Sequence, residues 1–290
     1  LMSPMTRHTR LTALLGSPVA HSISPLMHNE AFRLLDLDYT YLCFDVTEDT
    51  LPTAVAGLKA CGIRGFNLTM PNKNKIVELL DELSPAARLI GAVNTVVNDD
   101  GHLTGYNTDG VGYMQAVKDA GYDITGKTIT VMGAGGAATA ICAQAALDGV
   151  KRIHIFARET SRFWSRTQKL VENINSTLPC EAFLHENKDL AALAQAISES
   201  ALLLNATSVG MTPNTEGTII ENTGLYHPDL IVSDVIYNPR ETRFLREARE
   251  AGCRTFNGMY MLLYQGAEAF RLWTGQDMPV DKIKAKYFSE

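Results

Sequence analysis

Two glycines and an alanine at fixed spacing, Gly133, Gly135 and Ala138, follow a short β-branched run at residues 129–131. The run predicts a buried strand, and the small residues of 137–148 predict a helix after it. In this setting the first glycine permits a tight turn, the second leaves room for a pyrophosphate, and the alanine lets the helix pack closely. The helix N-terminus offers N–H groups and a positive dipole to an anion. We therefore predict a dinucleotide-binding turn, with a purely structural glycine turn as the alternative. The turn comprises Gly133, Ala134, Gly135, Gly136 and Ala137.

A lysine follows an earlier predicted strand, residues 63–68. Pro71 fits the first turn of a helix that we expect to run to about residue 83, so Lys73 would lie near a helix N-terminus. The dipole disfavours a cation there and favours the neutral amine, which suits proton transfer near neutral pH. The alternative is an ordinary solvated lysine, and Lys75 is a second candidate close by.

Asp109 and Gln265 are polar residues with two possible roles each. Asp109 precedes a predicted helix at 111–120, where it would be either an N-cap or a functional carboxylate. Gln265 stands among apolar neighbours in a predicted helix at 257–273. Such a glutamine is either a packing residue or a ligand contact.

Two serines follow the first predicted strand, residues 11–15. Ser24 precedes Pro25, a pattern typical of an N-cap and the first position of a helix, here 26–35. A cap and a ligand contact are both open for Ser24. Ser22 has no such capping position, and a loop hydroxyl at the carboxyl end of a strand is placed to meet a ligand.

The order of predicted elements indicates an α/β protein with two domains. In the first half, strands alternate with helices and predict an open α/β domain; these strands are 11–15, 39–46, 63–68, 91–98 and 102–106. In the second half they predict a doubly wound sheet of the Rossmann type; these strands are 129–131, 152–156, 182–184, 202–205, 230–235 and 254–256.

The turn after strand 152–156 is where the adenosine ribose is expected. It carries both signs of charge. Glu159 could accept the hydroxyls of an NAD ribose, while Arg158 and Arg162 could clamp the 2′-phosphate of NADP.

Composition narrows the class of protein. The chain has 290 residues, 46% of them hydrophobic, and a net charge of −6, which describes a folded globular chain and argues against nucleic acid as a partner. Five scattered cysteines without a C-x-x-C pair indicate reduced thiols and no metal site. Residues 1–10 do not resemble a signal peptide, so we expect a cytoplasmic protein. The uncharged stretch 129–147 is expected to be a buried strand, turn and helix with no membrane contact.

Taken together, these residues resemble the shikimate dehydrogenase family, and especially its quinate/shikimate dehydrogenase branch. The resemblance covers residues 11–273 and rests on seven motifs in family order. They are His21-Ser-Ile-Ser-Pro25, Asn67-Leu-Thr-Met-Pro-Asn-Lys73, Gly91-Ala-Val-Asn-Thr95, Gly105-Tyr-Asn-Thr-Asp-Gly110, Gly133-Ala-Gly-Gly-Ala137, Asn205-Ala-Thr-Ser-Val-Gly-Met211 and Gly258-Met-Tyr-Met-Leu-Leu-Tyr-Gln-Gly-Ala267.

The resemblance implies a role for each matched residue. Lys73 and Asp109 match the catalytic pair, which favours Lys73 over Lys75. The positions that match substrate contacts are Ser22, Ser24, Thr69, Asn94, Tyr237 and Gln265. The motifs also add Thr207 and Gly258 to the predicted cofactor site. The implied domains are residues 1–110, to which the C-terminal helix and 261–290 return, and residues 111–260, which bind the dinucleotide.

The chain departs from the family pattern at the ribose turn. Members that use NADP carry N-R-T-x-x-R, whereas this chain has Ala157-Arg-Glu-Thr-Ser-Arg162. Both arginines remain, but Glu159 replaces the threonine. Members of the quinate/shikimate branch carry an aspartate nearby and can use NAD. We therefore expect NAD and NADP both to work, with NADP slightly favoured.

The implied reaction is reversible hydride transfer between NAD(P) and the C3 hydroxyl of shikimate, with quinate as a second candidate substrate. We expect a small-molecule substrate, no nucleic-acid or membrane partner, and a monomer or homodimer. Two other functions suit the same fold, which does not by itself fix function. They are a non-catalytic cofactor-sensing regulator and a folate-type methylene dehydrogenase. The pair Lys73 and Asp109 argues against a pure binding protein.

Overall fold

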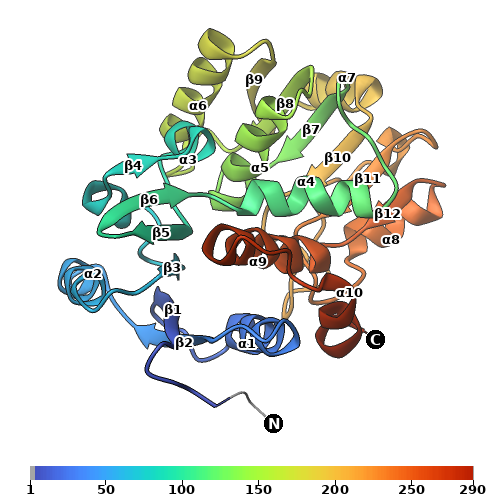
Figure 1. Cartoon of the computed structure of the whole chain (residues 1–290). Helices are drawn as coiled ribbons and strands as arrows, with labels where there is room; N and C mark the ends of the chain where they lie inside the picture. Colours follow the sequence, from blue (N-terminus) through green and yellow to red (C-terminus); the bar gives the residue numbers. More distant parts are fainter. Residues whose placement is uncertain (1–3, 290) are drawn as a thin grey trace. The chain divides into compact units, whose positions relative to one another are not determined.

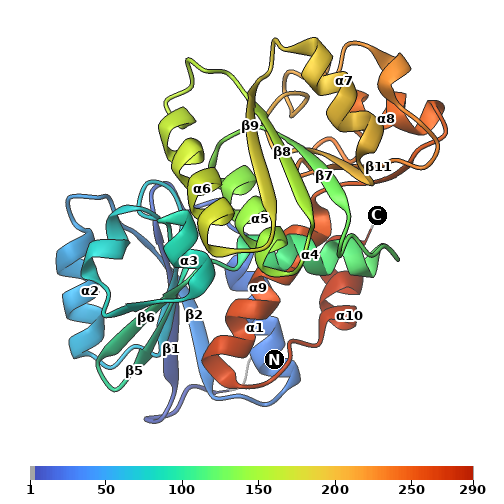
Figure 2. The same cartoon turned by 90° about the horizontal axis from the view of Figure 1, so that it is seen from above.

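The computed structural model describes residues 4–289 and consists of two compact units. Unit 1 comprises Leu1–Thr108 and Leu263–Glu290, and unit 2 comprises Asp109–Leu262. Each unit is built on one six-stranded sheet with helices packed against it (Figures 1 and 2). The predicted α/β class, with the C-terminal helix returning to the first unit, is confirmed. Within residues 4–289, no helix combines the length and apolarity needed to cross a membrane.

The sheet of unit 1 has the order β2-β1-β3-β5-β6-β4. Its strands are β1 (Arg10–Gly16), β2 (Tyr39–Asp45), β3 (Gly65–Leu68), β4 (Glu82–Leu83), β5 (Thr95–Asp99) and β6 (His102–Tyr106). β1 is parallel to β2 and β3, while β5 is antiparallel to β3 and β6, so the sheet is mixed. The helices are α1 (Ser24–Leu34), α2 (Leu51–Ala60), η1 (Lys75–Leu79), α3 (Pro85–Ile90), α9 (Met259–Thr274), α10 (Val280–Ile283) and η3 (Lys284–Phe288); α9 begins in unit 2.

The helix predicted from Pro71 to about residue 83 is wrong. The chain forms turns, then the short 3₁₀ helix η1, and then the strand β4, which pairs with β6. The buried Asn72 amide donates to the Val46 carbonyl at 2.8 Å and to the Leu15 carbonyl at 3.4 Å. These bonds hold the segment against β1 and the end of β2. A continuous helix from Pro71 could not keep Asn72 in this position. Lys73 therefore precedes η1 and is not at the start of a long helix.

The predicted N-cap at Ser24 is also wrong. Ser24 is the first residue of α1, and no side chain caps this helix at its N-cap residue Ile23. The hydroxyl of Ser22 instead accepts the Ser24 N–H at 3.2 Å. Ser22 thus has the local structural function that its position in the sequence did not suggest.

The sheet of unit 2 is parallel throughout, with the doubly wound order β12-β11-β10-β7-β8-β9. Its strands are β7 (Thr128–Met132), β8 (Arg152–Ala157), β9 (Glu181–Glu186), β10 (Leu202–Asn205), β11 (Ile231–Asp234) and β12 (Arg254–Phe256). Its helices are α4 (Asp109–Asp119), α5 (Gly136–Leu147), α6 (Trp164–Thr177), α7 (Leu190–Glu199), η2 (Thr223–Leu225) and α8 (Arg243–Glu250). α5 packs on β7 and β8 and α6 on β9, whereas α7 and α8 bury their apolar residues in one cluster with Met132, Leu203 and Val232.

An aromatic cluster holds α9 within unit 1. The indole N–H of Trp273 donates to the Val96 carbonyl at 3.0 Å, and its ring lies so close to Gly65 that a Cβ there would overlap it. The ring of His28 is fully buried and stacks on Tyr41 at 4.7 Å between centroids. Neither nitrogen of His28 has a hydrogen-bond partner among residues 4–289. Burial lowers the pKa of His28 to about 3, so the ring is neutral in the folded chain.

This burial predicts that acid destabilises unit 1 through His28. Below about pH 6.5 the unfolded chain binds a proton that the folded chain does not accept until about pH 3, so stability is lost as pH falls. We expect the free energy of unfolding to drop by about 3 kcal/mol more between about pH 6.5 and 4 in the wild type than in His28→Phe. Urea denaturation at several pH values measures the difference, with the exposed His8→Gln as control. If the free energy of unfolding falls equally steeply with pH in the wild type and in His28→Phe, the prediction is wrong.

Candidate active site

A buried hydrogen-bond network connects the ends of several elements in unit 1. The hydroxyl of Tyr41, from β2, donates to Asn67 Oδ1 at 2.8 Å. The amide of Asn67, from β3, donates to the Asn94 carbonyl at 3.1 Å and to Thr95 Oγ1 at 3.0 Å. Burial raises the pKa of Tyr41, so its hydroxyl stays protonated and remains a donor. Ser24 also hydrogen-bonds to Tyr41, which links the start of α1 to the same network.

Asn94 extends this network toward the end of the first unit. Its Oδ1 accepts from Thr95 Oγ1 at 3.0 Å and from the Thr108 N–H at 2.8 Å. Its Nδ2 donates to Thr108 Oγ1 at 3.0 Å. The buried Asn94 is therefore held on both sides of its amide. Thr108 is held in turn, and it directly precedes Asp109 in the chain.

Lys73 lies next to this network through its backbone. Its carbonyl accepts the Val93 N–H at 2.8 Å, and Val93 directly precedes Asn94. Thr69 begins the same turn, with its N–H donating to the Leu15 carbonyl at 3.1 Å and its side chain against Gly16. Lys75 is engaged elsewhere, since its Nζ lies 2.6 Å from Glu78 Oε1. Unit 1 thus gathers Lys73, Thr69 and Asn94, with Ser24 joined through Tyr41.

The remaining predicted residues lie on other elements. Asp109 is the first residue of α4 in unit 2, in the first turn where a carboxylate is favoured by the helix dipole. Tyr237 belongs to unit 2, and its side chain is exposed. Gln265 lies half-buried on the part of α9 that belongs to unit 1. Their grouping into one site with Lys73 stays a prediction.

The glycine turn of unit 2 fits a dinucleotide pyrophosphate. Gly133 has φ +121°, and a Cβ there would approach Thr207 Cγ2 to 3.0 Å and the Ala206 carbonyl to 3.1 Å. Gly135 and Gly136 have open space where a Cβ would stand. Gly135 is the N-cap residue of α5 and has no side chain that could cap the N–H groups of the helix, the groups that bind an anion in such folds. Ala138 is buried where α5 meets the sheet.

Thr207 and Gly258 are both fixed by close backbone contacts in unit 2. Thr207 donates from its hydroxyl to Asn205 Oδ1 at 2.7 Å, beside Gly133. A Cβ on Gly258 would overlap the Val235 carbonyl, so only glycine fits there. Among residues 4–289, no group of three or more His, Cys, Asp or Glu side chains is arranged to hold a metal ion.

The predicted ribose turn follows β8. Arg158 and Glu159 are exposed, and the Ser161 N–H closes the turn onto the Arg158 carbonyl at 2.9 Å. The guanidinium of Arg162 lies over the Phe163 ring, 4.6 Å from its centroid. The N–H of Glu159 donates to the Glu186 carboxylate at 2.6 Å. Glu186 is a second acidic side chain at this turn that the sequence alone did not indicate.

Comparison with known proteins finds the same family that the motifs resemble. Residues 14–96 match the family model "Shikimate dehydrogenase substrate binding domain", and residues 258–286 match "Shikimate 5'-dehydrogenase C-terminal domain". A shikimate dehydrogenase (NADP(+)) of Listeria monocytogenes is 54% identical over 98% of this chain and 97% of its own length. The chain belongs to the shikimate dehydrogenase family.

Solved structures of relatives agree with this membership. The shikimate 5-dehydrogenase of Listeria monocytogenes, in complex with shikimate and NAD, has a TM-score of 0.96 and 53% identity, covering 99% of both chains. The quinate dehydrogenase of Corynebacterium glutamicum, in complex with NAD, has a TM-score of 0.85 and 30% identity, covering 97% of this chain and 99% of its own. The predicted shikimate dehydrogenase family is therefore confirmed.

Several residues that organise this shikimate dehydrogenase fold were not in the predicted site. Tyr41, Asn67 and Thr108 position the predicted residues of unit 1. Asn67 and Thr108 lie inside two of the recognised motifs, so the sequence could have indicated that they belong near the site. Tyr41 had no signal, because its partner lies 26 residues away in the sequence.

Asp234 has a comparable function in unit 2. It is fully buried at the end of β11, where its carboxylate accepts from the Ile236 N–H at 2.9 Å and from Thr242 Oγ1 at 2.8 Å. It thereby fixes the segment that carries Tyr237. Burial raises the pKa of Asp234 to about 6, against the lowering effect of these hydrogen bonds.

We predict that the free energy of unfolding of the wild type falls as pH rises, because the pKa of Asp234 is raised in the folded chain. The folded chain keeps the proton up to about pH 6, whereas the unfolded carboxyl loses it near its usual value, so stability declines between about pH 4 and 6. Relative to wild type, Asp234→Asn should gain about 2 kcal/mol across this window. Chemical denaturation at stepped pH values tests this, with the exposed Asp229→Asn as the matched control. A difference that does not vary with pH would refute the assignment.

Proposed function

We propose that this chain catalyses the reversible oxidation of shikimate at its C3 hydroxyl, giving 3-dehydroshikimate, with NAD(P) as the hydride acceptor. One observation carries the proposal. The chain is 53% identical, over 99% of its length, to an enzyme whose structure holds shikimate and NAD. The glycine turn of unit 2, with open space over Gly135 and Gly136, supports a dinucleotide as the cofactor.

Lys73 and Asp109 are the proposed catalytic residues. Oxidising the alcohol removes a hydride from carbon and a proton from oxygen. Lys73 takes that proton in oxidation and returns it in reduction, as general acid–base catalysis requires. Asp109 orients the substrate hydroxyl through a charge-assisted hydrogen bond. The bonds of Val93 to the Lys73 backbone and of Asn94 to Thr108 support a fixed position for each residue.

The substrate carboxylate is bound by hydroxyl groups in this proposal. Ser22, Ser24 and Tyr237 donate to it, and no arginine of the motifs does so. Thr69, Asn94 and Gln265 contact the ring hydroxyls. Ser24 and Asn94 both join the network around Asn67, which supports a rigid, preorganised contact surface.

The cofactor residues hold and orient the dinucleotide. Gly133, Ala134, Gly135, Gly136 and Ala137 form the pyrophosphate turn, and Thr207 and Gly258 complete the cofactor site. Thr207 lies beside Gly133. Arg158, Glu159 and Arg162 meet the adenosine ribose. The bound nicotinamide supplies the hydride chemistry, so the protein contributes binding and orientation.

The deciding experiment is the reduction of NAD or NADP by the purified chain in the presence of shikimate, followed by the absorbance of the reduced nicotinamide. Turnover that depends on shikimate supports the proposal. Cofactor binding without turnover would favour a cofactor-sensing protein, and turnover of a methylene folate would favour the other alternative. Quinate, measured in the same assay, tests whether it is a second substrate, as the similarity to a quinate dehydrogenase suggests.

The first prediction of this function concerns Lys73. Lys73→Ala should lower kcat by about 10²–10⁴-fold, the usual contribution of an acid–base group, with little change in shikimate affinity. The neighbouring Lys75→Ala should keep its activity within about threefold, because that lysine is only half-buried and is paired with Glu78. Steady-state kinetics of both variants checks this. Near-normal turnover by Lys73→Ala would remove the proposed mechanism.

The second prediction concerns the cofactor. NAD and NADP should both support turnover, with kcat/KM values within about a hundredfold, which is under about 3 kcal/mol of discrimination. If Glu159 faces the ribose, Glu159→Thr should shift the ratio toward NADP by removing a charge that repels the 2′-phosphate. The two constants are measured for both proteins. An unchanged ratio would show that the Glu159 side chain does not face the ribose.

A further inference from the structure

The carboxylate of Glu186 lies on the turn where the ribose is expected. Glu186 is the last residue of β9 and pairs with Ala157, the last residue of β8. It therefore stands at the carboxyl edge of the parallel sheet, where ligands of doubly wound folds bind. Its Oε2 accepts the Glu159 N–H at 2.6 Å. The same carboxylate accepts the Lys188 N–H through Oε1, at 3.4 Å.

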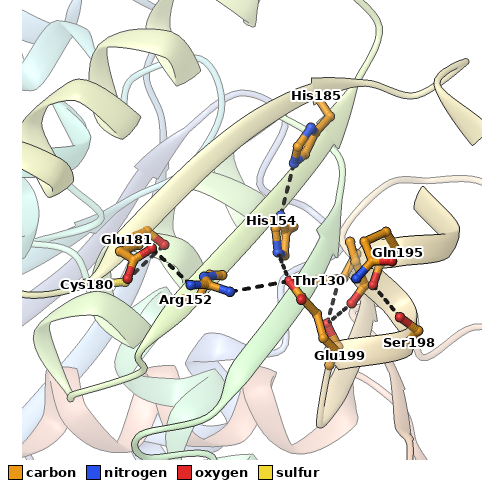
Figure 3. Close-up of polar contacts among 11 residues, drawn as sticks. Thr130, Arg152, His154, Cys180, Glu181, His185, Gln195, Ser198 and Glu199 are labelled. Carbon is orange, nitrogen blue, oxygen red and sulfur yellow. Dashed lines mark hydrogen bonds and ion pairs between the residues drawn. The ribbon is translucent and has the colours of Figure 1, made fainter. Parts of the chain in front are cut away.

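The end of β9 is anchored on the opposite face of the sheet. Figure 3 shows His185 pointing to His154 of β8, which points on to Glu199 of α7. His154 Nδ1 lies 3.0 Å from His185 Nε2, and His154 Nε2 lies 2.6 Å from Glu199 Oε1. His185 also stacks on Phe156 at 4.6 Å. Because side chains alternate along a strand, this anchoring of His185 directs Glu186 to the face covered by α5 and α6.

The hydrogen bond from the Glu159 N–H to Glu186 affects which dinucleotide can bind at this turn. A 2′-phosphate carries close to two negative charges and needs N–H groups and arginines around it. Glu186 already occupies the N–H of Glu159 and adds a negative charge beside it. A ribose with free hydroxyls brings no charge and can donate to a carboxylate. The geometry at this turn thus disfavours NADP and tolerates NAD.

We propose that Glu186 is a specificity-determining residue that biases this chain against the 2′-phosphate of NADP. The inference rests on the proposed function, in that it assumes a nicotinamide dinucleotide as the ligand of unit 2. Glu186 acts from a different strand than Arg158, Glu159 and Arg162, and it lies 27 residues beyond Glu159. The contact of Arg162 with Phe163 works in the same direction, because a phosphate clamp would give up that stacking.

Two substitutions test the inference by direct binding. Glu186→Gln removes the charge but keeps an oxygen that can accept the Glu159 N–H. Glu186→Ala removes both and leaves that N–H to the cofactor. The dissociation constants of NADH and NADPH are measured by fluorescence titration. We expect Glu186→Gln to bind NADPH about tenfold more tightly than wild type, which is about 1.4 kcal/mol, and Glu186→Ala at least as tightly. The affinity for NADH should stay within about threefold in both variants.

The matched control removes the same charge from the other end of the same strand. Glu181 is the first residue of β9, and its carboxylate pairs with Arg152 at the surface. Glu181→Gln should therefore leave the ratio of the NADH and NADPH dissociation constants unchanged. Circular dichroism and the thermal midpoint show that each variant folds. A ratio within twofold of wild type in both Glu186 variants would overturn the inference, as would equal weakening of both cofactors.

The same experiment separates this inference from the proposed function. Binding of NADH and NADPH is read without shikimate, so a shifted ratio supports the assignment of Glu186 even if no turnover occurs. Shikimate-dependent turnover with an unshifted ratio would leave the enzyme assignment standing and remove Glu186. A wild type that binds NADPH more than a hundredfold better than NADH would contradict the inference directly.

Discussion

The buried amide of Asn67 is the interaction on which the organisation of unit 1 depends. A buried amide must satisfy its donors and its acceptor, because leaving one unpaired costs about 1–3 kcal/mol. Here Tyr41 supplies the donor, while the Asn94 carbonyl and Thr95 supply acceptors. The result is that β2, β3 and β5 are joined by the side chains of Tyr41, Asn67 and Thr95. The Lys73 turn and Thr108 are positioned by neighbours of this single side chain.

The predicted cofactor site of unit 2 is shaped by backbone segments that lie very close to one another. Gly133 adopts a left-handed conformation against the Ala206 carbonyl, and Gly258 leaves room for the Val235 carbonyl. A Cβ at Gly258 would overlap that carbonyl, and a side chain at Gly133 would be strained by the positive φ, so glycine at both positions lets the segments after β7, β10 and β11 converge at one edge of the sheet. Buried polar groups then fix these segments, with Asn205 accepting from Thr207 and donating to Asp234. Packing of small residues and a few obligatory hydrogen bonds together shape the predicted dinucleotide site.

The two units differ in how far the sequence predicted them. In unit 2 the strand, the glycine turn and the helix are local features, and the sequence predicted all three along with the doubly wound sheet. In unit 1 the sequence predicted every strand except β4, which lies where a helix from Pro71 was expected. Proline and the following residues fit a helix locally, yet Asn72 bonds to Val46 and Leu15, and β4 pairs with β6. Long-range pairing therefore overruled local propensity at the turn that carries Lys73.

The sequence by itself determined the family, the α/β class and the order of the motifs, because these depend on residue type and on spacing within short segments. It also placed both arginines and Glu159 in the turn after β8. Only the tertiary structure showed Glu186 at the same turn, since strand register brings β9 beside β8. Register is set by packing over the whole sheet and leaves no mark in the spacing of nearby residues. The tertiary structure therefore decided which charges meet at the predicted ribose turn.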